Sequence, residues 1–216
     1  MHEGAKVCET AVRPSNYALT TQKWEHTMWR AALMAGTLAM AAALHAAAGP
    51  EQAGDFKLAS PDIAEGRKIP LAQVFNSFGC SGQNVSPALN WSHAPQGTQS
   101  FALLVHDPDA PTGSGWWHWV VYDIPATTTS LPAGAGDPKT KSLPVGALQG
   151  RTDFGTYAYG GPCPPPGKVH HYHFRLYALK VPKLVEVPGD ASAAFIAFNV
   201  HANAIGEADI TATYSR

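Results

Sequence analysis

The amino-acid sequence predicts a mostly β domain with a few short helices, and three observations favour this class. Of 216 residues, 45% are hydrophobic and only 14% are charged, which supplies apolar side chains for one sizeable core. The segments with the strongest local signal are short runs of Val, Leu and aromatic residues with Pro or Gly clusters at their ends. Long loops rich in Gly and Pro separate these runs, and loops of this kind often carry functional residues.

Three segments carry the strongest strand signal and should form the middle of a sheet. They are Ser100–Asp107, His118–Ile124 and His170–Leu179. Weaker strands are expected at Phe56–Leu58 and in the segment DITATYS, residues 209–215. In that last segment, alternate residues share one face of the strand: Ile210, Ala212 and Tyr214.

One helix is expected near the C-terminus. Asp190 is a suitable N-cap for the segment ASAAFIAFNVHANAIG, and Gly206 is expected to end the helix. Three apolar residues of this segment share a face: Ala194, Phe195 and Phe198.

The N-terminal region reads as a signal for export. From Met28 the chain has a basic residue, a short apolar run and a small-residue cleavage site: Arg30, Ala31–Leu44 and Ala46–Ala48. We therefore expect residues 1–27 to be a non-native extension, 28–48 a signal peptide and 49–216 the mature domain. This predicts a periplasmic or secreted bacterial protein, which is not an integral membrane protein once the signal is removed. An uncleaved anchor is the alternative.

Charge and cysteine content narrow the class further. The formal net charge is −1 and no run of Lys or Arg is present, so a nucleic acid is not an expected partner. Of the three cysteines only Cys80 and Cys163 remain after signal cleavage, and disulfides persist outside the cytoplasm. We expect Cys80 and Cys163 to form a disulfide. The protein itself is expected to be a monomer or a homodimer.

The segment DPDAPTGSGWWHWVVYDIP, residues 107–125, is the first candidate for a site. It gathers Asp107, Asp109 and His118 beside a Pro/Gly turn. Regular alternation divides the following strand into two faces: Trp116, His118, Val120 and Tyr122 on one, and Trp117, Trp119, Val121 and Asp123 on the other. Trp117 and Trp119 are then expected in the core. The alternative interpretation is a rigid turn capped by its own Asp side chains, with His118 as a core residue.

The segment GGPCPPPGKVHHYHF, residues 160–174, is the second candidate. A Gly/Pro loop leads into a strand in which His170 and Tyr172 share one face and His171 and His173 the other. Such a loop cannot relax, so it presents its groups to a ligand at a small entropic cost. A surface run of histidines is the alternative, especially for His171 and His173.

These motifs resemble those of a known family. FGCSGQNVSPALNW, DPDAP, GWWHWVVYDIP, TDFG, YGGPCPPPGKVHHYHFRLYAL and FNVHANAIGEADI occur in this order. The chain from Phe56 to Tyr214 closely resembles the bacterial branch of the phosphatidylethanolamine-binding protein family, also called Raf-kinase-inhibitor-like proteins. It is most similar to the exported members of that branch.

The resemblance implies a β-sandwich with a small anion-binding pocket for a phosphoryl-type head group. It implies no cofactor, no metal and no catalysis. The positions that match the family's ligand-binding residues are Asp107, Trp116, His118, Gly161, Pro162, Pro164, His170 and Tyr172, with Asp109 and Pro111 in support. The loop GPCPPPG departs from the commoner G-P-P-x-G by a cysteine and an extra proline.

The chemistry of these residue types suits an anion. Imidazole N–H groups, a tyrosine hydroxyl and loop backbone N–H groups can hold a phosphoryl group without Lys or Arg. Asp107 would orient an imidazole and favour its protonated form. Trp116 would form a wall able to face a cationic head group.

Three other function classes stay open at this point. Asp107, His118 and His170 could form a two-histidine, one-carboxylate metal site. Cys163 near His170 could act as the nucleophile of a hydrolase if it is not oxidised. Relatives in the family bind kinases or proteases, so an inhibitor or modulator of a protein partner is the third class.

Overall fold

The computed structural model describes residues 55–216. The expected extension at 1–27 and the signal peptide at 28–48 lie outside the described residues. No helix within 55–216 is long and apolar enough to cross a membrane.

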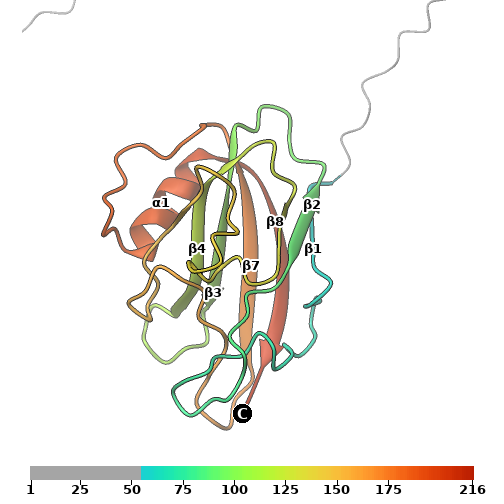
Figure 1. Ribbon diagram of the computed structural model, residues 1–216, viewed down its shortest axis with the longest axis vertical. Helices are drawn as coiled ribbons and strands as arrows, with labels where there is room; N and C mark the ends of the chain where they lie inside the picture. The colour runs from blue at the N-terminus through green and yellow to red at the C-terminus, as the bar shows by residue number, and fades with distance from the viewer. Residues whose placement is uncertain (1–54) are drawn as a thin grey trace, which may run out of the picture. The chain divides into compact units, whose positions relative to one another are not determined.

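Two antiparallel sheets and one helix make up the described domain. The larger sheet has the strand order β6-β4-β3-β7-β8 and the smaller one β1-β2-β5. The strands of the larger sheet are β3 (Ser100–Asp107), β4 (Trp116–Pro125), β6 (Leu148–Gln149), β7 (His170–Leu179) and β8 (Ala204–Tyr214). Those of the smaller sheet are β1 (Lys57–Ala59), β2 (Leu89–Ser92) and β5 (Ser130–Leu131). Figure 1 shows β1 and β2 on one side of the larger sheet and helix α1 (Ala193–Asn203) on the other.

Each face of the larger sheet buries its own core. On the first face, apolar side chains of β1, β2 and β5 pack against β3, β4 and β7, with Trp119 fully buried. On the second face, α1 packs against Ala102, Leu104, Val120 and Tyr177. The mostly β sandwich and its helix near the C-terminus are confirmed, but α1 is the one α-helix within residues 55–216, where a few short helices were expected.

The strand predictions agree closely with the structure. The bounds of β3 and β7 are those predicted, and β1 is displaced by one residue from the expected segment. The alternate residues of β8 predicted to share a face, Ile210, Ala212 and Tyr214, are all buried. The short strands β2, β5 and β6 were not predicted, because two to four residues are too few to show a period.

The helix prediction was wrong at both ends, and the face that Ala194, Phe195 and Phe198 were predicted to share is the exposed one. Ser192, not Asp190, is the N-cap, and its hydroxyl accepts a hydrogen bond from the Phe195 amide. The helix ends at Asn203 and β8 begins at once, so Gly206 lies inside a strand. There a Cβ would meet the Pro95 ring at 2.5 Å, which explains glycine by close packing. The buried residues are Ala193, Ile196, Ala197 and Val200, while Phe195 and Phe198 are exposed.

A β-bulge corrects the predicted faces of β4. Val105 pairs with Trp119 and His106 with Trp117, so His118 is the extra residue between two paired positions. The bulge reverses the alternation, and Trp119 and Val121 point into the first core. Val120 and Tyr122, which were expected on the same face as His118, belong to the second core. Half-buried Trp117 also packs against this core.

Candidate functional site

A cavity of about 190 Å³ lies at the end of the larger sheet, where β3 ends and β4 and β7 begin. Its lining residues are Phe78, Asp107, Ala110, Pro111, Thr112, Trp116, His118, Phe154, Cys163, Pro164, Pro165, His170 and Tyr172. We call this cavity the pocket. Seven of the ten residues predicted for the site line it, and Asp109, Gly161 and Pro162 do not.

Asp107 and His170 form the buried polar centre of the pocket. Nδ1 of His170 lies 2.7 Å from Oδ2 of Asp107, and both side chains are almost fully buried. Because a carboxylate only accepts, Nδ1 carries the hydrogen. The second ring nitrogen, Nε2, is thereby left for another partner. Asp107 was expected to orient an imidazole, and in the structure this imidazole belongs to His170.

The turn after β3 is held to β7 by its own carboxylates. Oδ1 of Asp107 accepts a hydrogen bond of 2.8 Å from the Asp109 amide. Oδ2 of Asp109 accepts from the amide of His171 at 2.8 Å and from its Nδ1 at 2.7 Å. These bonds with His171 lower the pKa of the Asp109 carboxyl, against a smaller opposite effect of burial. Asp109 thus supports the turn from outside the pocket.

His118 is held as a neutral imidazole. Its Nδ1 lies 2.6 Å from the carbonyl oxygen of Gly160, which can only accept, so Nδ1 is the protonated nitrogen. Burial lowers the pKa of His118 to about 4, against the opposing effects of the Gly160 carbonyl and the Asp107 carboxylate. In the ligand-free protein at neutral pH, Nε2 of His118 is therefore an acceptor.

Tyr172 supplies a hydroxyl that lies near the Asp107 carboxylate but meets no hydrogen-bond criterion within residues 55–216. Its side chain is 1% exposed, and its oxygen has no hydrogen-bond partner within residues 55–216. Burial and the nearby Asp107 carboxylate raise the pKa of Tyr172 above its ordinary value, so the hydroxyl keeps its hydrogen. A buried hydroxyl without a partner costs free energy, so such a group in a pocket points to a ligand or a water molecule.

Aromatic rings form a wall of the pocket. The Phe154 ring meets Trp116 at 5.4 Å and 83°, and His118 at 5.4 Å and 68°, both edge to face. Phe78 stacks on Phe154 at 6.0 Å. Phe154 and Phe78 belong to the motifs TDFG and FGC but were not predicted as site residues, because both lie in loops far along the chain from β3 and β4.

The Gly/Pro loop has a packing role at Gly161. A Cβ at this position would lie 2.0 Å from the carbonyl oxygen of Gln73, so only glycine fits. Its amide already donates to Oδ1 of Asn84 at 2.8 Å. Since proline has no N–H, Cys163 is the sole residue of 161–165 with an amide left for a ligand. The expected set of loop N–H donors is therefore reduced to one.

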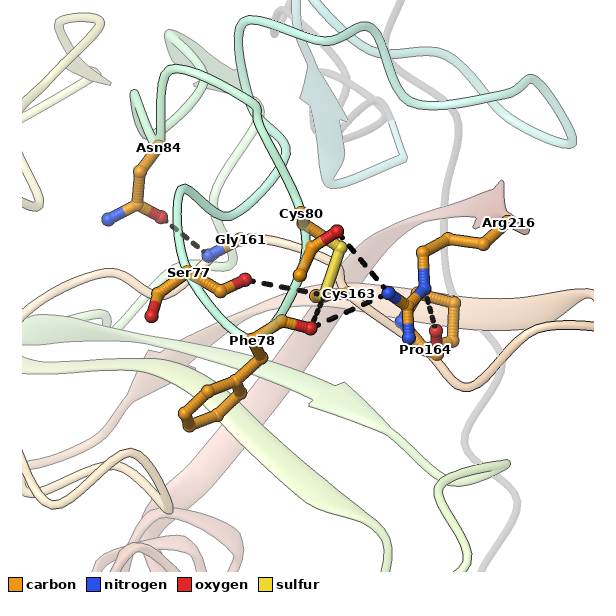
Figure 2. The surroundings of a disulfide bond; sticks show 9 residues. Ser77, Phe78, Cys80, Asn84, Gly161, Cys163, Pro164 and Arg216 are labelled. Carbon is orange, nitrogen blue, oxygen red and sulfur yellow. Dashed lines mark hydrogen bonds between the residues drawn. A yellow bond between two sulfur atoms is a disulfide. The ribbon is translucent and has the colours of Figure 1, made fainter.

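The predicted disulfide is present. Cys80 and Cys163 are joined with a Cα–Cα distance of 6.0 Å (Figure 2). Cys163 lines the pocket. The sulfur of Cys163 also lies 3.6 Å from the carbonyl oxygen of Ser77, as a contact without a hydrogen. Because neither cysteine is a free thiol, the alternative of a cysteine nucleophile is wrong for this oxidised form.

The proposed metal trio is not arranged as a chelate. Within residues 55–216 no three His, Cys, Asp or Glu side chains are grouped so that they could hold a metal ion. Nδ1 of His170 faces the Asp107 carboxylate, and Nδ1 of His118 faces the Gly160 carbonyl. No Lys or Arg is among the residues that line the pocket.

Comparison with known proteins agrees with this architecture. The family described as Phosphatidylethanolamine-binding protein matches residues 59–215. The UPF0098 protein YbcL of Escherichia coli is 51% identical over 164 residues, covering 76% of this chain and 89% of YbcL. The UPF0098 protein YbhB of the same organism is 48% identical, covering 74% of this chain and all of YbhB. The chain therefore belongs to the phosphatidylethanolamine-binding protein family.

Solved structures place it among bacterial members of that family. The crystal structure of Escherichia coli YbcL superposes with a TM-score of 0.73 at 50% identity, covering 75% of this chain and 99% of YbcL. A putative phosphatidylethanolamine-binding protein homologue from Chlamydia trachomatis superposes with a TM-score of 0.62 at 30% identity, covering 75% and 98%. The chain is thus a bacterial-type family member.

Neutral His118 predicts a specific loss of stability in acid. The unfolded chain takes up a proton near pH 6.5, whereas the folded protein resists it to about pH 4. Stability from this group is complete above pH 6.5 and falls by about 3 kcal/mol as the pH drops to 4.

Urea unfolding of the wild type and of His118→Gln between pH 7 and pH 4 measures this effect. The wild type should lose about 3 kcal/mol more than the variant over this range. Exposed His93, changed to Asn, serves as the control and should behave like the wild type. Parallel curves for wild type and His118→Gln would show that His118 titrates normally.

Proposed function

We propose that this protein binds a small ligand with an anionic, phosphoryl-type head group in the pocket, without catalysing a reaction. The observation that carries the proposal is the buried Tyr172 hydroxyl, which lacks a partner within residues 55–216 and belongs to the same cavity as His118 and His170. Proteins of this family are generally non-catalytic binding proteins, and the family is known for ligands with phosphate head groups.

Three polar groups would hold the head group. The Tyr172 hydroxyl donates a hydrogen bond to a phosphoryl oxygen. In both His118 and His170, Nδ1 is already hydrogen-bonded within the protein. Nε2 is therefore the ring nitrogen that is left for a ligand. Asp107 does not contact the anion in this scheme but orients the His170 ring.

The rest of the pocket would select by shape and hydrophobicity. Trp116, Phe154 and Phe78 present ring faces and edges suited to the carbon atoms or the ammonium group of the ligand. A cavity of about 190 Å³ has room for a small head group. Without Lys or Arg in the lining, the affinity for an anion is modest and depends on protons.

Proton uptake should therefore accompany binding. A neutral His118 can only accept at Nε2, whereas the protonated ring donates there to an anion. An anion in the pocket stabilises the imidazolium form, so its affinity increases as the pH falls. We expect the affinity for ethanolamine sulfate, whose charge is constant in this range, to rise about tenfold or more from pH 8 to pH 5.

Isothermal titration calorimetry at pH 8, 7, 6 and 5 tests this dependence, with phosphorylethanolamine as a second probe. The buffer dependence of the binding enthalpy counts the protons taken up. A flat affinity profile without proton uptake would contradict the role given to the histidines.

Tyr172→Phe should separate binding from stability. Removing a hydroxyl that bonds a charged head group should weaken phosphorylethanolamine binding by about tenfold or more. Because the same hydroxyl has no hydrogen-bond partner of normal geometry within residues 55–216, the free energy of unfolding should change by no more than about 1 kcal/mol. Titration calorimetry and urea unfolding give the two values. Unchanged affinity with reduced stability would assign Tyr172 a purely structural role.

We also propose that the protein is exported. The Cys80–Cys163 disulfide supports this location, because disulfides persist in oxidising compartments. A relative 36% identical over 158 residues is named a putative lipoprotein, LppC of Mycobacterium tuberculosis; the match covers 73% of this chain and 71% of LppC.

N-terminal sequencing of the protein expressed in a bacterial host from its full gene tests the export proposal. We expect a mature start near Gly49, in the periplasmic or secreted fraction. A cytoplasmic protein that retains residue 1 would contradict both the export and the proposed cleavage site.

A further inference from the structure

Three consecutive residues of the Gly/Pro loop are each bonded to one neighbouring loop, residues 75–84. The pairs are Gly161 N to Asn84 Oδ1 at 2.8 Å, Phe75 N to Pro162 O at 3.1 Å, and the disulfide between Cys163 and Cys80. The two loops thus form one wall of the pocket, which they line with Phe78, Cys163, Pro164 and Pro165.

Arg216 bonds the next residue of the same loop. Its Nε donates to the carbonyl oxygen of Pro164 at 2.6 Å, and Nη1 lies 3.5 Å from the carbonyl oxygens of both Phe78 and Gly79. Figure 2 shows the guanidinium beside the disulfide, between the two loops. Gly79 leaves room for it, because a Cβ there would lie 3.2 Å from Nη1.

The guanidinium therefore bridges two residues that line the pocket. Phe78 and Pro164 are lining residues from different loops, and both offer a carbonyl oxygen to Arg216. None of the ion pairs found within residues 55–216 involves Arg216. Its guanidinium N–H groups instead donate to backbone carbonyl oxygens.

We propose that Arg216 is a positioning residue of the pocket, which acts together with the Cys80–Cys163 disulfide to set the separation of Phe78 and Pro164. We call these two links the clasp. Its effect on ligand affinity rests on the proposed function, but its effect on the loop does not.

The clasp holds the Gly/Pro loop just before the point where the loop becomes exposed to solvent. Residues 165–169 are all exposed, and pairing with β8 resumes only at His170, opposite Tyr214. Pro164 is thus the last buried residue of the wall before this exposed segment. A planar guanidinium, with donors fixed in direction, defines the position of Pro164 in a way that a flexible ammonium cannot.

Two variants distinguish positioning from charge. Arg216→Met removes the positive charge and the planar set of N–H donors. Arg216→Lys keeps the charge but loses the planar donors. The control is Lys168→Met, which removes an exposed cation from the same loop. We expect both Arg216 variants to bind phosphorylethanolamine about tenfold more weakly, and Lys168→Met to bind like the wild type. Full rescue by Arg216→Lys would overturn the proposal in favour of a charge effect.

A second measurement needs no ligand. Hydrogen exchange of the Gly161 and Phe75 amides, which are hydrogen-bonded between the two loops, should become about tenfold faster in Arg216→Met than in the wild type, while the amides of β3 and β4 keep their rates. Unchanged exchange at Gly161 and Phe75 would overturn the clasp even if binding changed. If the wild type binds no phosphoryl probe but the loop exchanges faster in the variant, the proposed function fails and the clasp stands.

Removing the disulfide tests whether the two links act together. In Cys80→Ser/Cys163→Ser, Arg216 is the remaining link of the clasp. Arg216→Met should then accelerate exchange at Gly161 by a larger factor than it does in the oxidised protein. Equal factors in both backgrounds would show that the two links are independent and would overturn the joint action.

Discussion

The buried contact between Asp107 and His170 is the interaction on which the pocket depends. A carboxylate at 2% exposure must be paired, and His170 and the Asp109 amide satisfy its two oxygens. The same contact joins the end of β3 to the start of β7. It thereby places the turn that carries Asp109 against His171, and it directs Nε2 of His170 away from the carboxylate. Removing either partner would leave a buried polar group alone and disturb the whole end of the sheet.

Much of the fold could be predicted from the sequence, because the long strands are apolar runs with clear ends. The bounds of β3 and β7 followed from runs of Val, Leu and aromatic residues flanked by Pro or Gly, and the buried face of β8 followed from alternation. The faces of β4 did not, because alternation assumes one residue per pairing position, and His118 breaks that rule. The buried face of α1 was also missed: both Phe side chains were placed on one face, but the sheet selects smaller residues such as Ala197.

The candidate site was predictable where motif and strand coincide. Asp107, His118, His170 and Tyr172 all lie at strand ends of one sheet, so their meeting follows from the topology. Residues in distant loops were not predictable in this way. Phe154 reaches the pocket only because its own loop is paired with β4, where the Asp153 carboxylate accepts from the Trp117 amide. Gly161 was expected to contact a ligand because of its position in the motif. In the structure its surroundings instead require a residue without a side chain.

One bond at each of four consecutive loop residues, 161–164, also limits how this segment can change during evolution. Their partners are Asn84, Phe75, Cys80 and Arg216. A single inserted or deleted residue would move every later partner out of phase. A substitution at Cys163 removes one link and leaves the other partners in register, whereas Gly161 has no room for a side chain.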